Sequence, residues 1–154
     1  MDSYRARDLA YEEMTKWGLT QIGWRFAFNR RRCGLGLCSY SNKTIYLSAI
    51  YVNHNTESDV LNTIRHEIAH ALTPGANHGR MWKLMAMKVG CVSVNRVNEK
   101  ANMPKGRWTI KCKLCGSTSE KHRHTKLIQT NAKGYHCSKC GRRSVNMLEI
   151  IQNF

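Results

Sequence analysis

Two copies of one short cysteine motif near the end of the chain restrict its fold more than any other feature. The sequences CKLCG and CSKCG occupy residues 112–116 and 137–141 and together form the pattern CxxC-x21-CxxC. Four thiolates at such spacing are typical of a structural zinc site, and each glycine suits the tight turn of a zinc knuckle. Four unrelated reduced cysteines would not explain the repeated unit. We therefore predict one structural zinc ion, held by Cys112, Cys115, Cys137 and Cys140.

The flanking sequence predicts that these cysteines belong to a small zinc ribbon. The segments RWTIKC, GYHC and SVNMLEII have the composition of strands. A module of about 45 residues buries little apolar surface, so the metal would supply much of its stability. A polar linker is expected around Asn98–Lys105, and we predict two domains, residues 1–100 and 101–154.

A second pattern, RHEIAHALTPGANHG at residues 65–79, places three histidines and one glutamate close together. Apolar periodicity predicts a helix from Glu57 to about Leu72, capped by Thr56 and ended by Pro74-Gly75. On that helix His66 and His70 lie about 40° apart around the axis and about 6 Å apart along it, so they can share one metal ion. They lie nearly opposite the apolar stripe of the helix, and we expect them to face a cleft or solvent.

The sequence also offers a third ligand and a base for this site. A catalytic zinc uses three protein ligands and keeps one open position. His78 is the main candidate, provided the chain turns back at Thr73-Pro74-Gly75, because a continued helix would carry it about 12 Å away. His54 and a distant carboxylate remain as alternatives. Glu67 follows the first histidine directly and can reach a metal-bound water without ligating the metal.

The rest of the first domain predicts helices packed on a short antiparallel sheet. Residues 3–17 have helical periodicity, residues 24–31 alternate as a strand, and residues 33–48 form two strands around a turn at 41–43. We expect a three-stranded antiparallel meander. A further helix is expected at about Gly79–Val89, with Met81, Trp82, Leu84, Met85 and Val89 buried. Cys33, Cys38 and Cys91 have no partner spacing and are expected to be buried thiols.

These motifs resemble those of the SprT-like family of zinc metalloproteases, in its compact bacterial or phage type. The family pairs HExxH with a later His-Gly-x-x-Phe/Trp-Lys, as HEIAHA and HGRMWK do here, and CGLGLCSYSNKTIYLS resembles its strand hairpin. A C-terminal zinc ribbon also occurs in the family, so the resemblance covers most of residues 5–150. It implies His66, His70 and His78 as zinc ligands and Glu67 as the general base. The expected fold class is α+β, a small zincin-like domain followed by a four-cysteine zinc ribbon.

The net positive charge of the chain indicates which kind of partner it binds. The formal net charge is +15, with 14 Lys+Arg against 8 Asp+Glu in residues 1–104 and 11 against 2 in residues 105–154. Such an excess attracts nucleic acid. We expect DNA or another nucleic acid as a partner through a basic surface, beside a protein substrate. Arg30-Arg31-Arg32 is either a solvated turn or a further phosphate contact. Trp108 and Tyr135 either stack on bases or form the small core of the ribbon.

Composition places this chain among globular proteins. It is 42% hydrophobic, it has no run of eighteen apolar residues, and its first residues lack the apolar core of a secretory signal. We expect a monomeric cytoplasmic protein, with nucleoid association as an option and no membrane partner.

The leading functional hypothesis is a zinc metallopeptidase of the HExxH type that cleaves nucleic-acid-associated proteins, with one catalytic and one structural zinc. Glu67 would activate a zinc-bound water. One alternative is a zinc protein that binds nucleic acid in transcription or repair without proteolysis. The other is a zinc-dependent nuclease, although the glutamate within HExxH fits peptide hydrolysis better.

Overall fold

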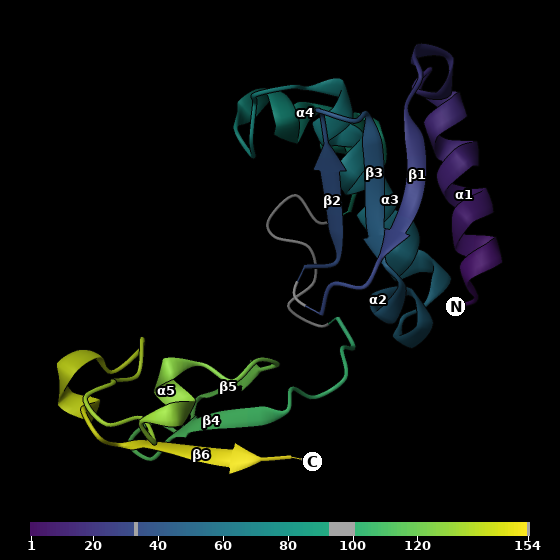
Figure 1. The fold of residues 1–154 in the computed structure, drawn as a ribbon. Helices are drawn as coiled ribbons and strands as arrows, with labels where there is room; N and C mark the ends of the chain where they lie inside the picture. The colour runs from purple at the N-terminus through teal and green to yellow at the C-terminus, as the bar shows by residue number, and fades with distance from the viewer. Residues whose placement is uncertain (33, 93–100, 154) are drawn as a thin grey trace. The chain divides into compact units, whose positions relative to one another are not determined.

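The chain forms two compact units, Met1–Met103 and Pro104–Phe154, in a computed structural model that describes residues 1–32, 34–92 and 101–153 (Figure 1). Each unit has its own three-stranded sheet. The predicted domain boundary follows residue 100. Residues 93–100, which include the first part of the predicted linker, lie outside the described residues. The next residues belong to the first unit, because Asn55 bonds to both the backbone N–H and the carbonyl of Asn102.

In its described residues, the first unit combines four helices with a small sheet. Its elements are α1 (Ser3–Lys16), the 3-10 turn η1 (Thr20–Ile22), β1 (Arg25–Asn29), β2 (Gly36–Ser39), β3 (Thr44–Ser48), α2 (Ala49–His54), α3 (Glu57–Leu72) and α4 (Arg80–Lys88). The predicted helices at 3–17 and 57–72 are confirmed. The Thr56 hydroxyl accepts from the Asp59 N–H and the Asp59 carboxylate accepts from the Thr56 N–H, a complete capping box at the start of α3.

The sheet differs from the predicted antiparallel meander. Its order is β1-β3-β2, with β3 antiparallel to β2 but parallel to β1. The central strand of the sheet is β3, whose Ile45 and Leu47 are fully buried, and β2 is an edge strand. The prediction of an antiparallel meander was wrong. It assumed that strands adjacent in the sequence are also adjacent in the sheet, whereas the most buried strand, β3, occupies the central position.

Helix α3 is the central element of this unit. It packs against α1, α4, β2 and β3, and its Val60, Ile64 and Ile68 are fully buried in the core. In Figure 1 it lies across one face of the sheet, beside α1. This placement brings one flank of α3 against the edge strand β2 and another against α4.

Helix α4 is less buried than its pattern predicted. Trp82 and Val89 are buried and Met85 packs against the core, as expected. Met81 and Leu84, however, are 63% and 50% exposed. Among the described residues its main packing partner is α3, and a helix that packs on one side needs a narrower apolar stripe than this sequence offers.

The second unit is a small β-structure. Its elements are β4 (Trp108–Cys112), β5 (Thr118–Lys121), α5 (Lys126–Gln129), the 3-10 turn η2 (Gly141–Ser144) and β6 (Leu148–Gln152), with an antiparallel sheet of order β5-β4-β6. The strand predicted at GYHC is wrong. There the backbone makes turns instead, with Gly134 N–H donating to Asn146 Oδ1 and Tyr135 N–H to the Ala132 carbonyl. Trp108 is buried, as expected for a ribbon core residue.

The α+β class with small sheets is thus confirmed. Among the described residues, no helix has the length and apolar character needed to cross a membrane.

Candidate metal sites

Three histidine side chains converge at the C-terminal end of α3. The Nε2 atom of His78 lies 3.1 Å from the Nε2 atom of His66 and 3.1 Å from that of His70. An ion bound tetrahedrally at 2.0–2.1 Å holds its nitrogen ligands about 3.3 Å apart. The three imidazoles are therefore spaced to hold one metal ion, and they form one of two such groups in the described chain.

His78 reaches this site because the chain reverses after α3. Successive tight turns follow the helix: Thr73 N–H donates to the His70 carbonyl, Ala76 N–H to Thr73, and Gly79 N–H to Ala76. Gly75 occupies the left-handed region, with φ 77°, which a side chain would strain. His54, the competing candidate, lies in the last turn of α2, where its Nδ1 bonds to the Ile50 carbonyl, and it is not part of the group.

The indole of Trp82 forms one wall of this site. Its ring lies 4.6 Å from that of His66, 5.1 Å from that of His70 and 4.5 Å from that of His78, between centroids. His66 is only 6% exposed, although the helical wheel predicted a position facing a cleft or solvent. The wheel correctly separated His66 from the main apolar stripe, but α4 covers this second side of α3.

Burial and mutual repulsion keep the imidazoles of His66 and His70 neutral. Burial first, and then the neighbouring histidines, lower the pKa of His66 to about 3, and burial with His78 lowers the pKa of His70 to about 4. A metal ion requires the unprotonated ring, so both side chains are in the binding form at neutral pH.

Glu67 directly follows His66 in α3, and its side chain lies in a tight space between α3 and the edge strand β2. Its carboxylate is buried and accepts a hydrogen bond from the Cys38 backbone N–H, while burial raises its pKa to about 8. A β-carbon built on Gly36 would lie 2.5 Å from the Glu67 Oε1 atom. Only glycine fits there. A cation on the histidines would favour the ionised form of Glu67.

Sequence reasoning missed the contribution of β2 to this site. Cys38, predicted as a buried thiol, is half-buried and contacts Glu67 through its backbone, while Cys91 is buried as expected and Cys33 lies outside the described residues. The signal that was available is Gly36, because a glycine inside a strand often marks a close approach.

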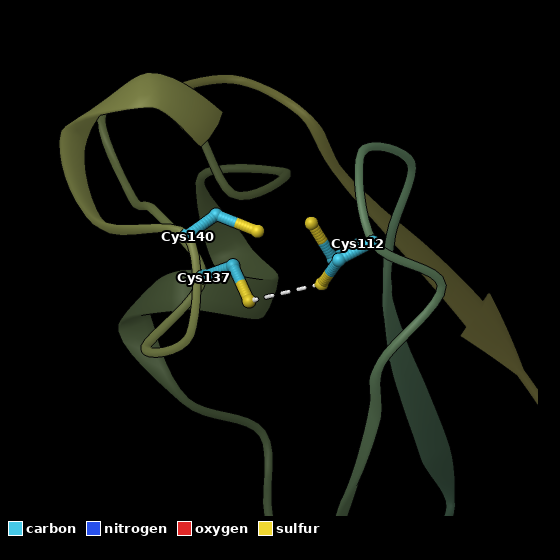
Figure 2. Close-up of side chains that lie close together, drawn as sticks. Cys112, Cys137 and Cys140 are labelled. Carbon is cyan, nitrogen blue, oxygen red and sulfur yellow. Dashed lines mark hydrogen bonds between the residues drawn. The ribbon is translucent and has the colours of Figure 1, made fainter.

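The four cysteines come together in the second unit, as the CxxCG pattern suggested. Their four Sγ atoms all lie within 4.8 Å of one another. Figure 2 shows the sulfur atoms of Cys112, Cys137 and Cys140 directed towards a common centre. Both motifs make the same turn, with Gly116 N–H donating to the Cys112 carbonyl at 2.8 Å and Gly141 N–H to the Cys137 carbonyl at 2.9 Å. Both glycines have positive φ.

Hydrogen-bond donors prepare this group for a cation. The Ser117 hydroxyl lies 3.1 Å from Cys115 Sγ and 3.3 Å from Cys137 Sγ, and it is the main cause that lowers the pKa of Cys137 to about 6. The crowded neighbouring sulfurs, Cys115 first, raise the pKa of Cys140 to about 12. Without a cation, the group therefore resists full deprotonation, whereas a divalent ion would stabilise all four thiolates.

Fold and sites define an α+β protein with two groups able to hold metal ions, both compatible with zinc. The model of the SprT-like family matches residues 6–104, and the chain belongs to that family. Protein SprT of Escherichia coli (strain K12 / DH10B) and Protein SprT of Shigella dysenteriae serotype 1 are each 24% identical to it over 148 residues. These alignments cover 92% of this chain and 89% of each relative.

Proposed function

We propose that this protein is a zinc-dependent endopeptidase whose histidine site hydrolyses peptide bonds. The observation that carries this proposal is that three imidazoles converge while Glu67, the residue directly after the first of them, is buried and is not part of the ligand group. A purely structural site has no use for such a group. His66, His70 and His78 would hold the ion, and Cys112, Cys115, Cys137 and Cys140 would hold a second, structural one.

When bound, zinc supplies Lewis-acid polarisation of the scissile carbonyl. The chain supplies the proton transfers. The Glu67 carboxylate takes a proton from the attacking water and passes it to the nitrogen of the leaving amine. The Cys38 N–H holds the carboxylate in place during both transfers.

The edge strand β2, which contacts Glu67, supports the proposal that the substrate is a polypeptide. The Ser48 N–H donates to the Leu35 carbonyl, so in this antiparallel pair Leu35 and every second residue after it bond to β3. The backbone groups of Gly36 and Cys38 therefore point away from β3. Since the Cys38 N–H bonds to Glu67, a paired peptide would use the Gly36 groups and the Cys38 carbonyl. An extended peptide paired with this edge would pass directly beside Glu67.

The exposed basic side chains of the second unit support the proposal that nucleic acid is a partner. Among residues 104–153 the structure shows no salt bridge, and most basic side chains there are exposed, including Lys111, Lys113, Arg123, Lys126, Lys133, Lys139, Arg142 and Arg143. We infer that this basic surface contacts phosphates and that the substrates are proteins associated with nucleic acid. Arg30, Arg31 and Arg32 are also exposed and would add contacts from the first unit.

The basic surface and the cysteine group also favour a second candidate function, a nucleic-acid-binding protein without proteolysis. Variants of Glu67 distinguish the two, because binding does not need a base.

The test compares wild type with Glu67→Gln, using a basic DNA-binding protein as substrate, with and without single-stranded DNA, and reading fragments by mass spectrometry. Glu12→Gln, an exposed change on α1, is the matched control. We expect fragments from wild type and Glu12→Gln only, and more of them with DNA. Binding of DNA without fragments from any variant would favour the second function.

A further inference from the structure

We propose that Tyr40 is a positioning residue of the histidine site, which holds the edge strand β2 against the end of helix α3. Tyr40 directly follows β2, and its hydroxyl donates a 2.8 Å hydrogen bond to the backbone carbonyl of His70. The two residues are 30 positions apart in the chain. The activity readout below rests on the proposed function, whereas the metal-binding and exchange readouts do not.

The bond acts where α3 is least restrained by its own hydrogen bonds. The last carbonyls of a helix have no partner one turn further on. The His70 carbonyl accepts a turn bond from the Thr73 N–H at 3.0 Å. The Tyr40 hydroxyl adds a donor from a different element, so it fixes where the helix end lies relative to the strand.

The tyrosine ring is itself held in place. It meets the indole of Trp24 edge-on, with centroids 6.1 Å apart and planes at 84°. Trp24 is buried, whereas Tyr40 is 44% exposed. Since the ring contributes little to the core, removal of its hydroxyl would change the bond to His70 more than the packing.

A second contact joins the same two elements two residues earlier. The Cys38 N–H donates to the Glu67 carboxylate, and the Cys38 thiol also interacts with the Tyr40 hydroxyl. Cys38 lies in β2 and Tyr40 directly after it, while Glu67 and His70 are three positions apart on α3 and so share one side of the helix. Strand β2 and the residue that follows it thus contact α3 at Glu67, the proposed general base, and at His70, a proposed metal ligand.

Removal of the Tyr40 hydroxyl would loosen both contacts. His70 would no longer have this restraint on its backbone, and the Cys38 N–H would hold Glu67 less firmly. Groups that orient metal ligands change metal affinity or activity by about 10–100-fold when removed. Because this bond acts through the backbone, we expect the lower end, about 10-fold.

The experiment compares Tyr40→Phe with Tyr46→Phe in the full chain loaded with zinc. Tyr46 is the matched control, because its hydroxyl accepts from Asn42 Nδ2 within the β2–β3 hairpin. Three quantities are measured: zinc release to a chromophoric chelator, amide exchange of Cys38, and kcat and KM for a cleaved protein.

For Tyr40→Phe we expect about 10-fold weaker zinc binding at the histidine site with an unchanged ribbon ion, faster exchange at Cys38, and about 10-fold lower kcat with KM within two-fold. Tyr46→Phe should match wild type. The proposal is overturned if the two variants behave alike in zinc release and Cys38 exchange, whether both change or neither does. If wild type cleaves nothing, the proposed function fails, but these two readouts still decide the role of Tyr40.

Discussion

Gly36 and Glu67 are in such close contact that strand β2 has no room for a side chain at this position. A β-carbon on Gly36 would lie 2.5 Å from Oε1, 2.8 Å from Cγ and 2.9 Å from Cδ of Glu67. The whole end of the glutamate side chain therefore rests on the strand backbone. The position of the Glu67 carboxylate depends on this missing side chain.

Substitution Gly36→Ala should therefore displace Glu67. We expect cleavage to fall by more than about 10-fold and the free energy of unfolding to fall by about 1–3 kcal/mol, the usual cost of overpacking. Urea unfolding and a cleavage assay measure the two effects. Ser39→Ala in the same strand is the control, and equal behaviour of the two variants would contradict the account.

Trp82 should be the main stabilising residue of α4. It is fully buried against all three histidine rings, and Trp82→Ala should lower the free energy of unfolding by about 3–5 kcal/mol. Leu84→Ala, on the exposed side of the same helix, should change it by about 0.5 kcal/mol or less. Urea unfolding of both variants checks this, and a larger effect for Leu84→Ala would show that its side chain is covered.

Features set by local sequence could be predicted, and those set by distant contacts could not. Helix α3 begins at its Thr56 cap and ends before Pro74 because caps and breakers act on their neighbours. The two CxxCG turns are local in the same way. The pairing of β1 with β3 is not, because it depends on which strand can be covered by the helices.

The same division applies within the histidine site. The spacing of His66, Glu67 and His70 is fixed by helix geometry, so the sequence alone placed them together. The contact of Tyr40 with His70 depends on the path of β2 across α3, and neither residue carries a local mark of it. The burial of Trp82 and the exposure of Leu84 likewise depend on how α4 rotates against α3.

The second unit should depend on its metal ion. Cys115→Ser removes one thiolate, so we expect one ion fewer per chain and faster amide exchange in β4 and β5, with the first unit still protected. Ser117→Ala, which removes only a hydrogen bond to two sulfurs, should keep the ion. Native mass spectrometry counts the ions. Retention of both ions and full protection in Cys115→Ser would show that the cysteines are not ligands.

Binding of single-stranded DNA should weaken with salt. The slope of log affinity against log salt becomes shallower by about 0.7 for each phosphate that the protein no longer neutralises. Replacing Lys133, Lys139, Arg142 and Arg143 with alanine should therefore reduce the slope by about 0.7 for each of these side chains that binds a phosphate. Fluorescence anisotropy at several salt concentrations measures it. An unchanged slope would place the nucleic-acid contact elsewhere or exclude it.

The most direct test of the central claim measures metal content and peptide cleavage on the same samples of wild type and Glu67→Gln. The account predicts equal metal at the histidine site in both proteins, with cleavage in wild type only, because Glu67 moves protons and does not bind the ion. Equal cleavage by the two proteins, or loss of the histidine-site ion in Glu67→Gln, would contradict it.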